Sequence, residues 1–250
     1  MTVQPNIAAN PAEEPSSLRR VGVVVPARDE ADGLALLIPA LAGFGLGQLV
    51  IADNASSDGT GTVARGLGAD VVREEQLGYG AACVAALGAL RADIEIVVFL
   101  DADLADDPEQ LPRLVAPIQA GEADLVIGCR PPELRARGAM TPPQAFGNRL
   151  ATWLIRLLWS HAYTDLGPFR AIRRSSLEQL DMADRRFGWT VEMQVRALQE
   201  GLGVQEVEVP YRARAHGLSK ISGTAAGVAR AGGSILYTIG RLWLAERLRR

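Results

Sequence analysis

The sequence of 250 residues has little cysteine, little histidine and no long apolar run, and each shortage excludes a class of protein. Its two cysteines, Cys83 and Cys129, lie singly inside apolar runs, which predicts buried free thiols rather than a disulfide or a paired metal site. The two histidines, His161 and His216, are too far apart to suggest a histidine metal site. No apolar stretch reaches the roughly 20 residues of a membrane-spanning helix, and the longest, 231–240, is bracketed by arginines.

A secretory signal is also missing, because residues 1–20 lack a basic start followed by an apolar centre. This segment mixes Pro, Asn, Glu and Ser without apolar periodicity, which predicts a flexible N-terminal arm. We therefore expect a cytoplasmic protein. The formal net charge of -3 provides no general attraction for nucleic acid, so a nucleic-acid function is disfavoured.

The first half of the chain alternates β-branched apolar runs with segments of helical apolar spacing. Strands are expected at 21–25, 49–52, 70–73, 94–100 and 125–128, and helices at 30–41, 58–67, 79–90 and 108–120. This alternation predicts an α/β fold with a parallel sheet. No linker composition divides the chain, so we expect one domain. In such folds the ligand binds outside the carboxyl ends of the strands.

The second half is less regular. It predicts a Pro- and Arg-rich loop at 129–143, helices at 145–159 and 190–199, strands at 169–172 and 204–209, and a basic loop at 210–222. A terminal helix follows, and its apolar residues share one face: Ile235, Leu236, Ile239, Leu242 and Trp243. This face either lies on a membrane surface or packs on the domain or on a second subunit.

The sharpest feature is the carboxylate pair of Asp101-Ala102-Asp103, directly after a hydrophobic strand. Alternate side chains of an extended segment point the same way, so Asp101 and Asp103 can converge on a hard cation that bridges diphosphate oxygens. Such a cation stabilises a departing nucleotide. The alternative is a solvated acidic loop, because Asp106, Asp107 and Glu109 follow.

Three other strand ends carry polar or glycine-containing loops, at 26–30, 53–60 and 76–81. Carboxylates such as Asp53 and Asp58 can contact a base or ribose, although turn and helix-cap roles are the alternative. Gly78 comes directly before the helix predicted at 79–90, and Gly80 lies in its first turn. Backbone N–H groups there can approach a phosphate, but ordinary turn chemistry explains both glycines equally well.

Taken in order, these loops resemble the motifs of family 2 glycosyltransferases of the GT-A fold. The opening, nucleotide-contacting and metal-binding motifs are similar to residues 24–30, 51–60 and 101–103. In the acceptor half, residues 165–170 resemble the D-x-G-F-R segment of polyprenyl-phosphate sugar synthases, such as dolichol-phosphate mannose synthase, and residues 216–220 resemble their G-x-S-K loop. The membrane helices that those enzymes often carry at the carboxyl end are absent from this sequence.

The resemblance implies one GT-A domain over residues 21–250, with a Rossmann-like, mostly parallel central sheet flanked by helices. Within it, 21–129 would bind the nucleotide sugar, 130–222 the acceptor, and 223–250 would form the amphipathic helix. Asp101 and Asp103 would hold Mg²⁺ or Mn²⁺, and Lys220 would add positive charge at the phosphates. The implied donor contacts are Pro26, Ala27, Arg28, Glu30, Asp53, Asn54, Asp58, Gly78, Gly80, Asp101, Ala102 and Asp103.

The family's usual chemistry is direct displacement with inversion at the anomeric carbon of the sugar. A hydroxyl acceptor would require a carboxylate base, for which Glu192 and Asp165 are the candidates. A phosphate acceptor is already anionic, and four arginines could bind it: Arg130, Arg135, Arg137 and Arg170. The alternatives are helix N-terminal electrostatics for Glu192 and a solvated loop for the arginines. We expect hexose transfer from a UDP- or GDP-sugar to a phosphorylated, polyprenyl-type acceptor at the cytoplasmic membrane face.

Three other functions compete with this hypothesis. A sugar-nucleotide pyrophosphorylase would carry a glycine-rich basic loop where this chain has residues 26–30, which contain no glycine. The same loop argues against a dinucleotide-dependent oxidoreductase. A nucleotide-sugar-binding protein without turnover is disfavoured because Asp101, Asp103 and Lys220 are all present.

Overall fold

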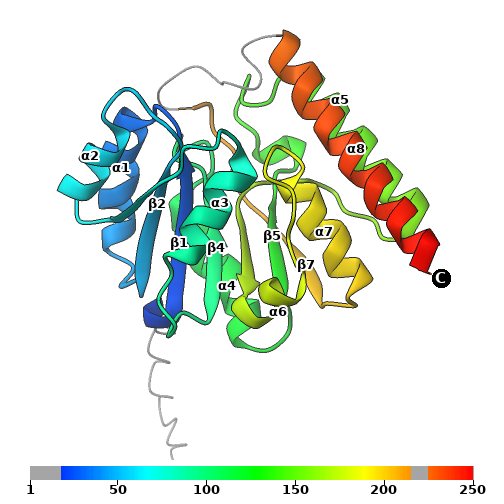
Figure 1. Cartoon of the computed structure of the whole chain (residues 1–250), viewed down its shortest axis with the longest axis horizontal. Helices are drawn as coiled ribbons and strands as arrows, with labels where there is room; N and C mark the ends of the chain where they lie inside the picture. The colour runs from blue at the N-terminus through cyan, green and yellow to red at the C-terminus, as the bar shows by residue number, and fades with distance from the viewer. Residues whose placement is uncertain (1–17, 215–224, 250) are drawn as a thin grey trace, which may run out of the picture.

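The computed structural model describes residues 18–214 and 225–249, which form an α/β fold around one seven-stranded sheet (Figure 1). The strand order is β3-β2-β1-β4-β6-β5-β7, and every neighbouring pair is parallel except the two that involve β6. The strands are β1 (Val21–Ala27), β2 (Gln48–Asp53), β3 (Asp70–Arg73), β4 (Ile96–Phe99), β5 (Leu125–Cys129), β6 (Arg170–Arg173) and β7 (Val204–Glu208). The predicted mostly parallel sheet is therefore confirmed.

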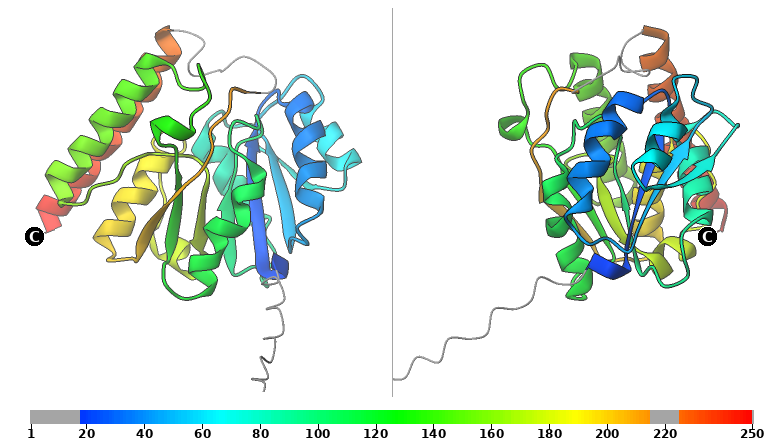
Figure 2. Two further views of the ribbon diagram at one scale, coloured as in Figure 1. Left: turned by 180° about the vertical axis from the view of Figure 1, so that it is seen from behind. Right: turned by 90° about the vertical axis from the view of Figure 1, so that its left-hand side faces the viewer.

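Helices cover both faces of the sheet, as Figure 2 shows from two further sides. They are α1 (Ala31–Ala42), α2 (Thr60–Gly66), α3 (Tyr79–Gly88), α4 (Leu111–Gln119), α5 (Pro142–Trp159), α6 (Arg174–Gln179), α7 (Trp189–Gln199) and α8 (Ala225–Arg249), with short 3-10 turns η1 (Leu18–Arg20), η2 (Pro108–Gln110) and η3 (Pro132–Leu134). Alternate β1 residues pack into two cores, Val24 with α3 and Val23 with α1 and α4. Burial on both faces explains the continuous β-branched run of this strand.

The boundaries differ from the sequence predictions in three places. Leu18–Arg20, assigned to the flexible arm, form η1, and Leu18 is buried in the core beside β1. The helix predicted at 108–120 is divided into η2 and α4. Helix α6, only six residues long, was not predicted, because a segment this short shows little periodicity.

Helix α8 packs against α5 and α7, so the predicted apolar face is partly covered by the domain itself. Ile239 and Leu242 are buried there, whereas Leu236 remains exposed. The carboxylate of Glu246 accepts hydrogen bonds from Trp159 Nε1 on α5 at 2.7 Å and from Gln199 Nε2 on α7 at 3.0 Å. Within the parts of the chain that the structure describes, no helix is both long enough and apolar enough to cross a bilayer.

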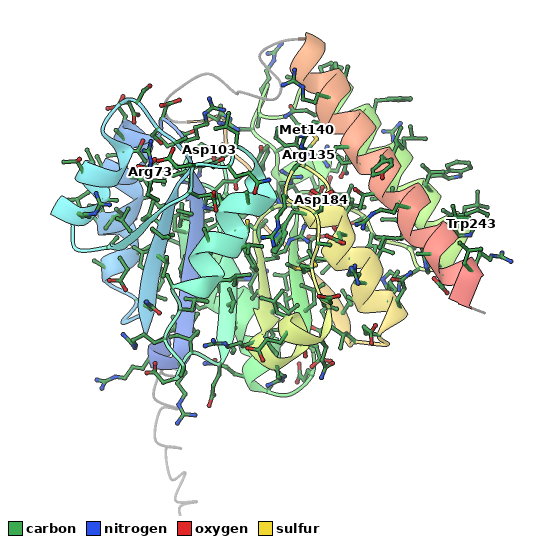
Figure 3. The ribbon with its side chains drawn as sticks, in the orientation of Figure 1. Arg73, Asp103, Arg135, Met140, Asp184 and Trp243 are labelled. Atoms are coloured by element: carbon green, nitrogen blue, oxygen red, sulfur yellow. The ribbon has the colours of Figure 1, made fainter. Side chains whose placement is uncertain are left out.

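The carboxyl ends of β1, β2 and β4 lie at one edge of the sheet, where Figure 3 places Asp103. The residues that begin α5 lie near the same edge. This helix starts where Thr141 and Gln144 form a capping box, with Pro142 at the first helical position. Cys83 and Cys129 are buried and unpaired, as predicted.

Candidate active site

A pocket of about 400 Å³ opens at this edge of the sheet. Most of the residues predicted to contact the donor line it: Pro26, Ala27, Arg28, Glu30, Asn54, Gly78, Asp101, Ala102 and Asp103. They come from the end of β1 and from the loops after β1, β2, β3 and β4, so parallel strand pairing brings four distant sequence segments together. A pocket at this edge is where doubly wound folds bind nucleotides.

Asp53 and Asp58 do not line the pocket, and their donor contacts stay a prediction. Asp53 accepts a hydrogen bond from the Ser56 amide at 3.0 Å and pairs with Arg73 at 2.8 Å. Burial raises the pKa of Asp53, but these bonds outweigh burial and the pKa is lowered. Asp58 accepts from the amides of Ala31 and Thr60 at 3.1 and 2.9 Å, which is a turn and cap role between α1 and α2.

The amides at the start of α3 are engaged within the protein, and their contact with a phosphate stays a prediction. The Gly78 amide donates to Asn54 Oδ1 at 2.9 Å, and the Gly80 amide donates to the Arg186 carbonyl at 3.1 Å. A Cβ atom added at Gly78 or Gly80 would overlap the carbonyl oxygens of Arg185 or Asp184. These glycines therefore permit the close approach of the loop that precedes α7, and Gly80 does not line the pocket.

Asp101 and Asp103 both line the pocket; Asp103 is buried, and Asp101 is half-buried with its Oδ1 atom shielded from solvent. Asp103 Oδ1 accepts from the Ala105 amide at 3.0 Å, and Oδ2 pairs with Arg214 Nη2 at 3.0 Å. Arg214 Nη1 lies 3.7 Å from Glu30 Oε1. Asp101 Oδ1, in contrast, has no hydrogen-bond partner among the residues that the structure describes. Burial and the neighbouring charge of Asp103 raise the pKa of Asp101 to about 7.

This arrangement fits a divalent cation. A buried carboxylate oxygen without a partner, beside a second carboxylate, is unfavourable unless a positive charge lies between them. Hard cations such as Mg²⁺ and Mn²⁺ prefer oxygen ligands of this kind. Over residues 18–214 and 225–249, no group of three or more His, Cys, Asp and Glu residues is placed to hold a metal. Asp101 and Asp103 would therefore share the cation with oxygens of a bound diphosphate.

Asp165 and Arg130 form a buried pair, while their roles as base and as acceptor-phosphate ligand stay predictions. Arg130 Nε and Nη2 donate to the two carboxylate oxygens of Asp165 at 2.7 and 2.9 Å. Burial raises the pKa of Asp165, but Arg130 more than offsets burial and the pKa is lowered. The Arg130 guanidinium also lies 4.6 Å from the ring centre of Tyr211. Asp165 is thus a poor general base, and Arg130 is engaged away from the pocket lining.

The other predicted acceptor arginines are not gathered in the pocket either. Arg170 is fully buried on β6, where it donates to the carbonyl oxygens of Gly167 and Thr190, so its role is to hold the fold together. Burial lowers the pKa of Arg170 to about 10. Arg135 Nε donates to the Arg130 carbonyl oxygen, and Arg137 is exposed on the same loop.

Glu192 was predicted as a candidate base, a role that stays a prediction. The side chain is fully buried at the start of α7 and does not line the pocket. Its oxygens pair with Arg196 at 3.1 Å and with Arg241 of α8 at 2.8 Å, and they accept from the Asp184 amide at 2.6 Å. Glu192 therefore joins α7 to α8. The predicted phosphate-binding Lys220 and the rest of its G-x-S-K loop lie outside the described residues.

The sequence analysis missed several residues that line the pocket: Leu77, Tyr79, Arg186, Phe187, Arg214 and Arg230. Arg214 belongs to the predicted basic loop, so its charge could have been noted, but its contact with Asp103 depends on a fold that spans 111 positions of sequence. Arg186 lies in the irregular segment before α7 and gives no local signal. The pocket thus combines acidic residues from the strand ends with arginines from later segments.

Comparisons with known proteins agree with this geometry. The family profile described as glycosyl transferase family 2 matches residues 22–181. The chain is 39% identical over 209 residues to an uncharacterized glycosyltransferase of Mycobacterium tuberculosis, covering 83% of this chain and 92% of that one. It is 30% identical over 234 residues to polyprenol monophosphomannose synthase of Mycolicibacterium smegmatis, covering 85% and 86% of the two chains.

A third relative is the dolichyl-phosphate hexose transferase of Haloferax volcanii, 34% identical over 206 residues that cover 80% of this chain and 83% of that one. Among solved structures, glucosyl-3-phosphoglycerate synthase of Mycobacterium tuberculosis, in complex with Mn²⁺, uridine diphosphate and glucosyl-3-phosphoglycerate, superposes with a TM-score of 0.71 at 24% identity. That match covers 93% of this chain and 86% of the synthase and shows a shared GT-A fold. With a profile match over most of its length, this chain belongs to glycosyl transferase family 2.

Proposed function

We propose that this chain is a metal-dependent, inverting glycosyltransferase that moves a hexose from a UDP- or GDP-sugar to a phosphorylated, polyprenyl-type acceptor. The observation that carries the proposal is the buried, unpartnered oxygen of Asp101 beside Asp103, in a pocket at the carboxyl edge of the sheet. The relatives named as polyprenol monophosphomannose synthase and dolichyl-phosphate hexose transferase support the acceptor class. The synthase crystallised with Mn²⁺ and uridine diphosphate supports the donor class and the cation.

In this proposal the protein's own groups bind and orient the donor. The loop of Pro26, Ala27 and Arg28 and the side chain of Asn54 border the pocket on the β1 and β2 side, where the nucleoside would lie. Asp101 and Asp103 would hold Mg²⁺ or Mn²⁺, which, when bound, supplies Lewis-acid stabilisation of the leaving diphosphate.

Three arginines of the pocket, Arg186, Arg214 and Arg230, supply additional positive charge. Charge that is fixed in place before reaction stabilises a leaving group most effectively. Arg214 must release Asp103 Oδ2 for a cation to bind there, and it would then lie close to the donor phosphates or the acceptor phosphate.

The positions of the two predicted bases outside the pocket support a phosphate acceptor. Glu192 and Asp165 are buried and engaged by arginines, so neither is placed to remove a proton from an acceptor hydroxyl. A phosphate acceptor needs no base, because its oxygen is already an anion at neutral pH. Its charge suits the arginines that line the pocket. The geometry therefore favours a phosphorylated acceptor over a sugar hydroxyl.

The test is transfer of radiolabelled hexose from UDP- and GDP-sugars to three acceptors: a polyprenyl phosphate, 3-phosphoglycerate and an unphosphorylated sugar. We expect transfer to polyprenyl phosphate that EDTA abolishes and Mn²⁺ restores. Asp101→Asn and Asp103→Asn should each lower kcat/KM by about 10²-fold or more. The matched control is Asp93→Asn, an exposed acid paired with Arg91 far from the pocket, which should react as the parent chain does.

Full activity in EDTA, or in Asp103→Asn, would overturn the metal-dependent mechanism. Transfer only to the unphosphorylated sugar would overturn the acceptor class. Binding of the nucleotide sugar without product formation from any of the three acceptors would favour the alternative of a binding protein without turnover. Membership of glycosyl transferase family 2 argues against the pyrophosphorylase alternative.

A further inference from the structure

Helices α5 and α8 pack side by side and form one flank of the molecule, away from α1 and α2 (Figures 1 and 2). This flank exposes six large apolar residues, each more than half accessible to solvent: Phe146, Trp153 and Leu157 on α5, and Tyr237, Leu244 and Leu248 on α8. We refer to these six residues as the α5/α8 surface. Isolated exposed apolar residues are ordinary, but large ones gathered along two adjoining helices mark an interaction site.

The spacing shows that the exposure is systematic. On each helix the three residues are separated by seven and then four positions, which places them on one helical face. The opposite faces supply core residues, Ala151 and Ile155 on α5 and Ile239 and Leu242 on α8. Each helix is therefore apolar towards the core and apolar again towards the outside, a pattern that the packing of this chain alone does not require.

The charges on these helices are almost all positive. Residues Pro142–Trp159 and Ala225–Arg249 contain several arginines, no lysine or aspartate, and one glutamate, Glu246. Glu246 is directed into the protein by Trp159 and Gln199, so it does not neutralise the outside. The exposed arginines include Arg149 and Arg156 on α5 and Arg247 on α8.

Helix α8 also reaches the pocket. Arg230 is exposed on α8 and lines the pocket, and Tyr237 follows seven residues later on the same helix. At the rise of an α-helix, these positions are about 10 Å apart along the axis. A substrate whose phosphate is in the pocket and whose chain is embedded in a membrane under α5 and α8 would need to span only this distance.

We propose that the α5/α8 surface binds an anionic lipid bilayer, with its aromatic and leucine side chains at the headgroup level and its arginines against lipid phosphates. Tryptophan, tyrosine and arginine side chains suit this interface, since each has an apolar body and a polar end. A second copy of the chain is the less favourable occupant. It would bring exposed arginines together, and neither helix offers an exposed acid to pair with them. This proposal rests on the proposed function in one respect, namely that the membrane would carry the acceptor.

The test is co-sedimentation with vesicles that contain no acceptor. We expect the full chain to bind vesicles of phosphatidylcholine with phosphatidylglycerol, to bind pure phosphatidylcholine weakly, and to dissociate as salt is raised. Trp153→Glu and Tyr237→Glu should abolish sedimentation. Arg149→Gln should weaken the vesicle partition coefficient by about fivefold. The matched control is Leu36→Glu on α1, at 48% exposure against 55% for Trp153, which should bind as the parent chain does.

Light scattering and thermal unfolding of each variant accompany these measurements. A folded Trp153→Glu variant that still binds vesicles would overturn the proposal, as would a parent chain that binds no vesicle. A parent dimer that Trp153→Glu converts to a monomer, without vesicle binding by either, would assign the surface to a second copy instead. Transfer to a short, water-soluble isoprenyl phosphate separates the two proposals. The Trp153→Glu variant should keep this transfer activity. If the parent chain itself lacks the activity, the proposed function is contradicted but the membrane-binding proposal is not.

Discussion

At the scale of single residues, Arg214 is a cation that contacts carboxylates of the pocket. It bridges Asp103 and Glu30 in the pocket. Arg214→Ala should lower kcat/KM by about 10²-fold, because a positive charge at the phosphates is lost. It should also tighten Mn²⁺ binding in the absence of nucleotide by about tenfold, because Asp103 loses a competing cation. Steady-state kinetics and Mn²⁺ titration by electron paramagnetic resonance measure the two effects.

The control for this substitution is Arg212→Ala. Arg212 pairs with Asp107 at 2.7 Å two residues earlier, but it does not line the pocket. Arg212→Ala should leave both Mn²⁺ affinity and kcat/KM within about threefold of the parent values, because the largely exposed Arg212 side chain lies outside the pocket. Equal losses in the two variants would show that Arg214 acts through the fold of this segment rather than through its charge.

Asp106 predicts a dependence of stability on pH. Burial raises its pKa to about 8, and its Oδ1 has no hydrogen-bond partner among the described residues. The native carboxyl thus holds its proton more tightly than the unfolded one, whose pKa is about 3.9. The contribution to stability is complete below about pH 4 and is lost as the pH rises through about 8.

Urea unfolding in EDTA at pH 5 and pH 8 tests this dependence. The free energy of unfolding of the parent chain should fall between the two pH values, by up to about 1.4 kcal/mol per pH unit for each such group. In the Asp106→Asn variant the free energy of unfolding should fall less steeply with pH. The remaining slope should come from Asp101, whose pKa is raised to about 7. A slope unchanged by the substitution would contradict this assignment.

Single residues also show where sequence reasoning reached its limit. Asp101 and Asp103 could be placed at the pocket because a hydrophobic strand directly precedes them and fixes the edge at which they emerge. Glu192 and Arg170 could not be placed, because their buried partners come from distant or irregular segments. A charged residue in a sequence shows what it can bind but not whether the fold has already paired it.

At the scale of elements, the junction of α7 with α8 is closely packed around Gly188. A Cβ atom added there would overlap Thr238 Oγ1 and Asp184 Oδ2. Gly188→Ala should therefore lower the free energy of unfolding by about 1 to 3 kcal/mol, the range for an overpacked site. Gly232→Ala in α8 is the control, because its Cβ would meet nothing within 4 Å. It should be neutral or stabilise by up to about 1 kcal/mol.

Urea unfolding of the two variants tests this prediction. Destabilisation by both would contradict the assignment of the effect to close packing around Gly188.

The identities of most elements could be predicted from the sequence, since β-branched runs alternate with helical spacing in the first half. The antiparallel position of β6 between β4 and β5 could not be predicted, because a strand gives the same apolar pattern in either direction.

At the scale of the whole molecule, one extended segment joins the loop after β4 to the loop after β5. The Arg212 amide donates to the Ala105 carbonyl oxygen, and the Ala136 amide donates to that of Tyr211, both at 2.8 Å. The loop of Asp101 and Asp103 after β4 and the arginine-rich loop after β5 are thus held to the same extended segment. Such contacts join residues that are far apart in sequence, so the alternation of strands and helices predicted the fold class but not this connection.

The central claim is that Asp101 and Asp103 hold a divalent cation against the diphosphate of a nucleotide sugar. The most direct measurement is an anomalous difference map from crystals of the chain grown with Mn²⁺ and a uridine or guanosine diphosphate. The account predicts one peak between the two carboxylates and the diphosphate, with Arg214 displaced from Asp103 Oδ2. A bound nucleotide without a peak there, or a peak that persists in the Asp101→Asn, Asp103→Asn double variant, would contradict it.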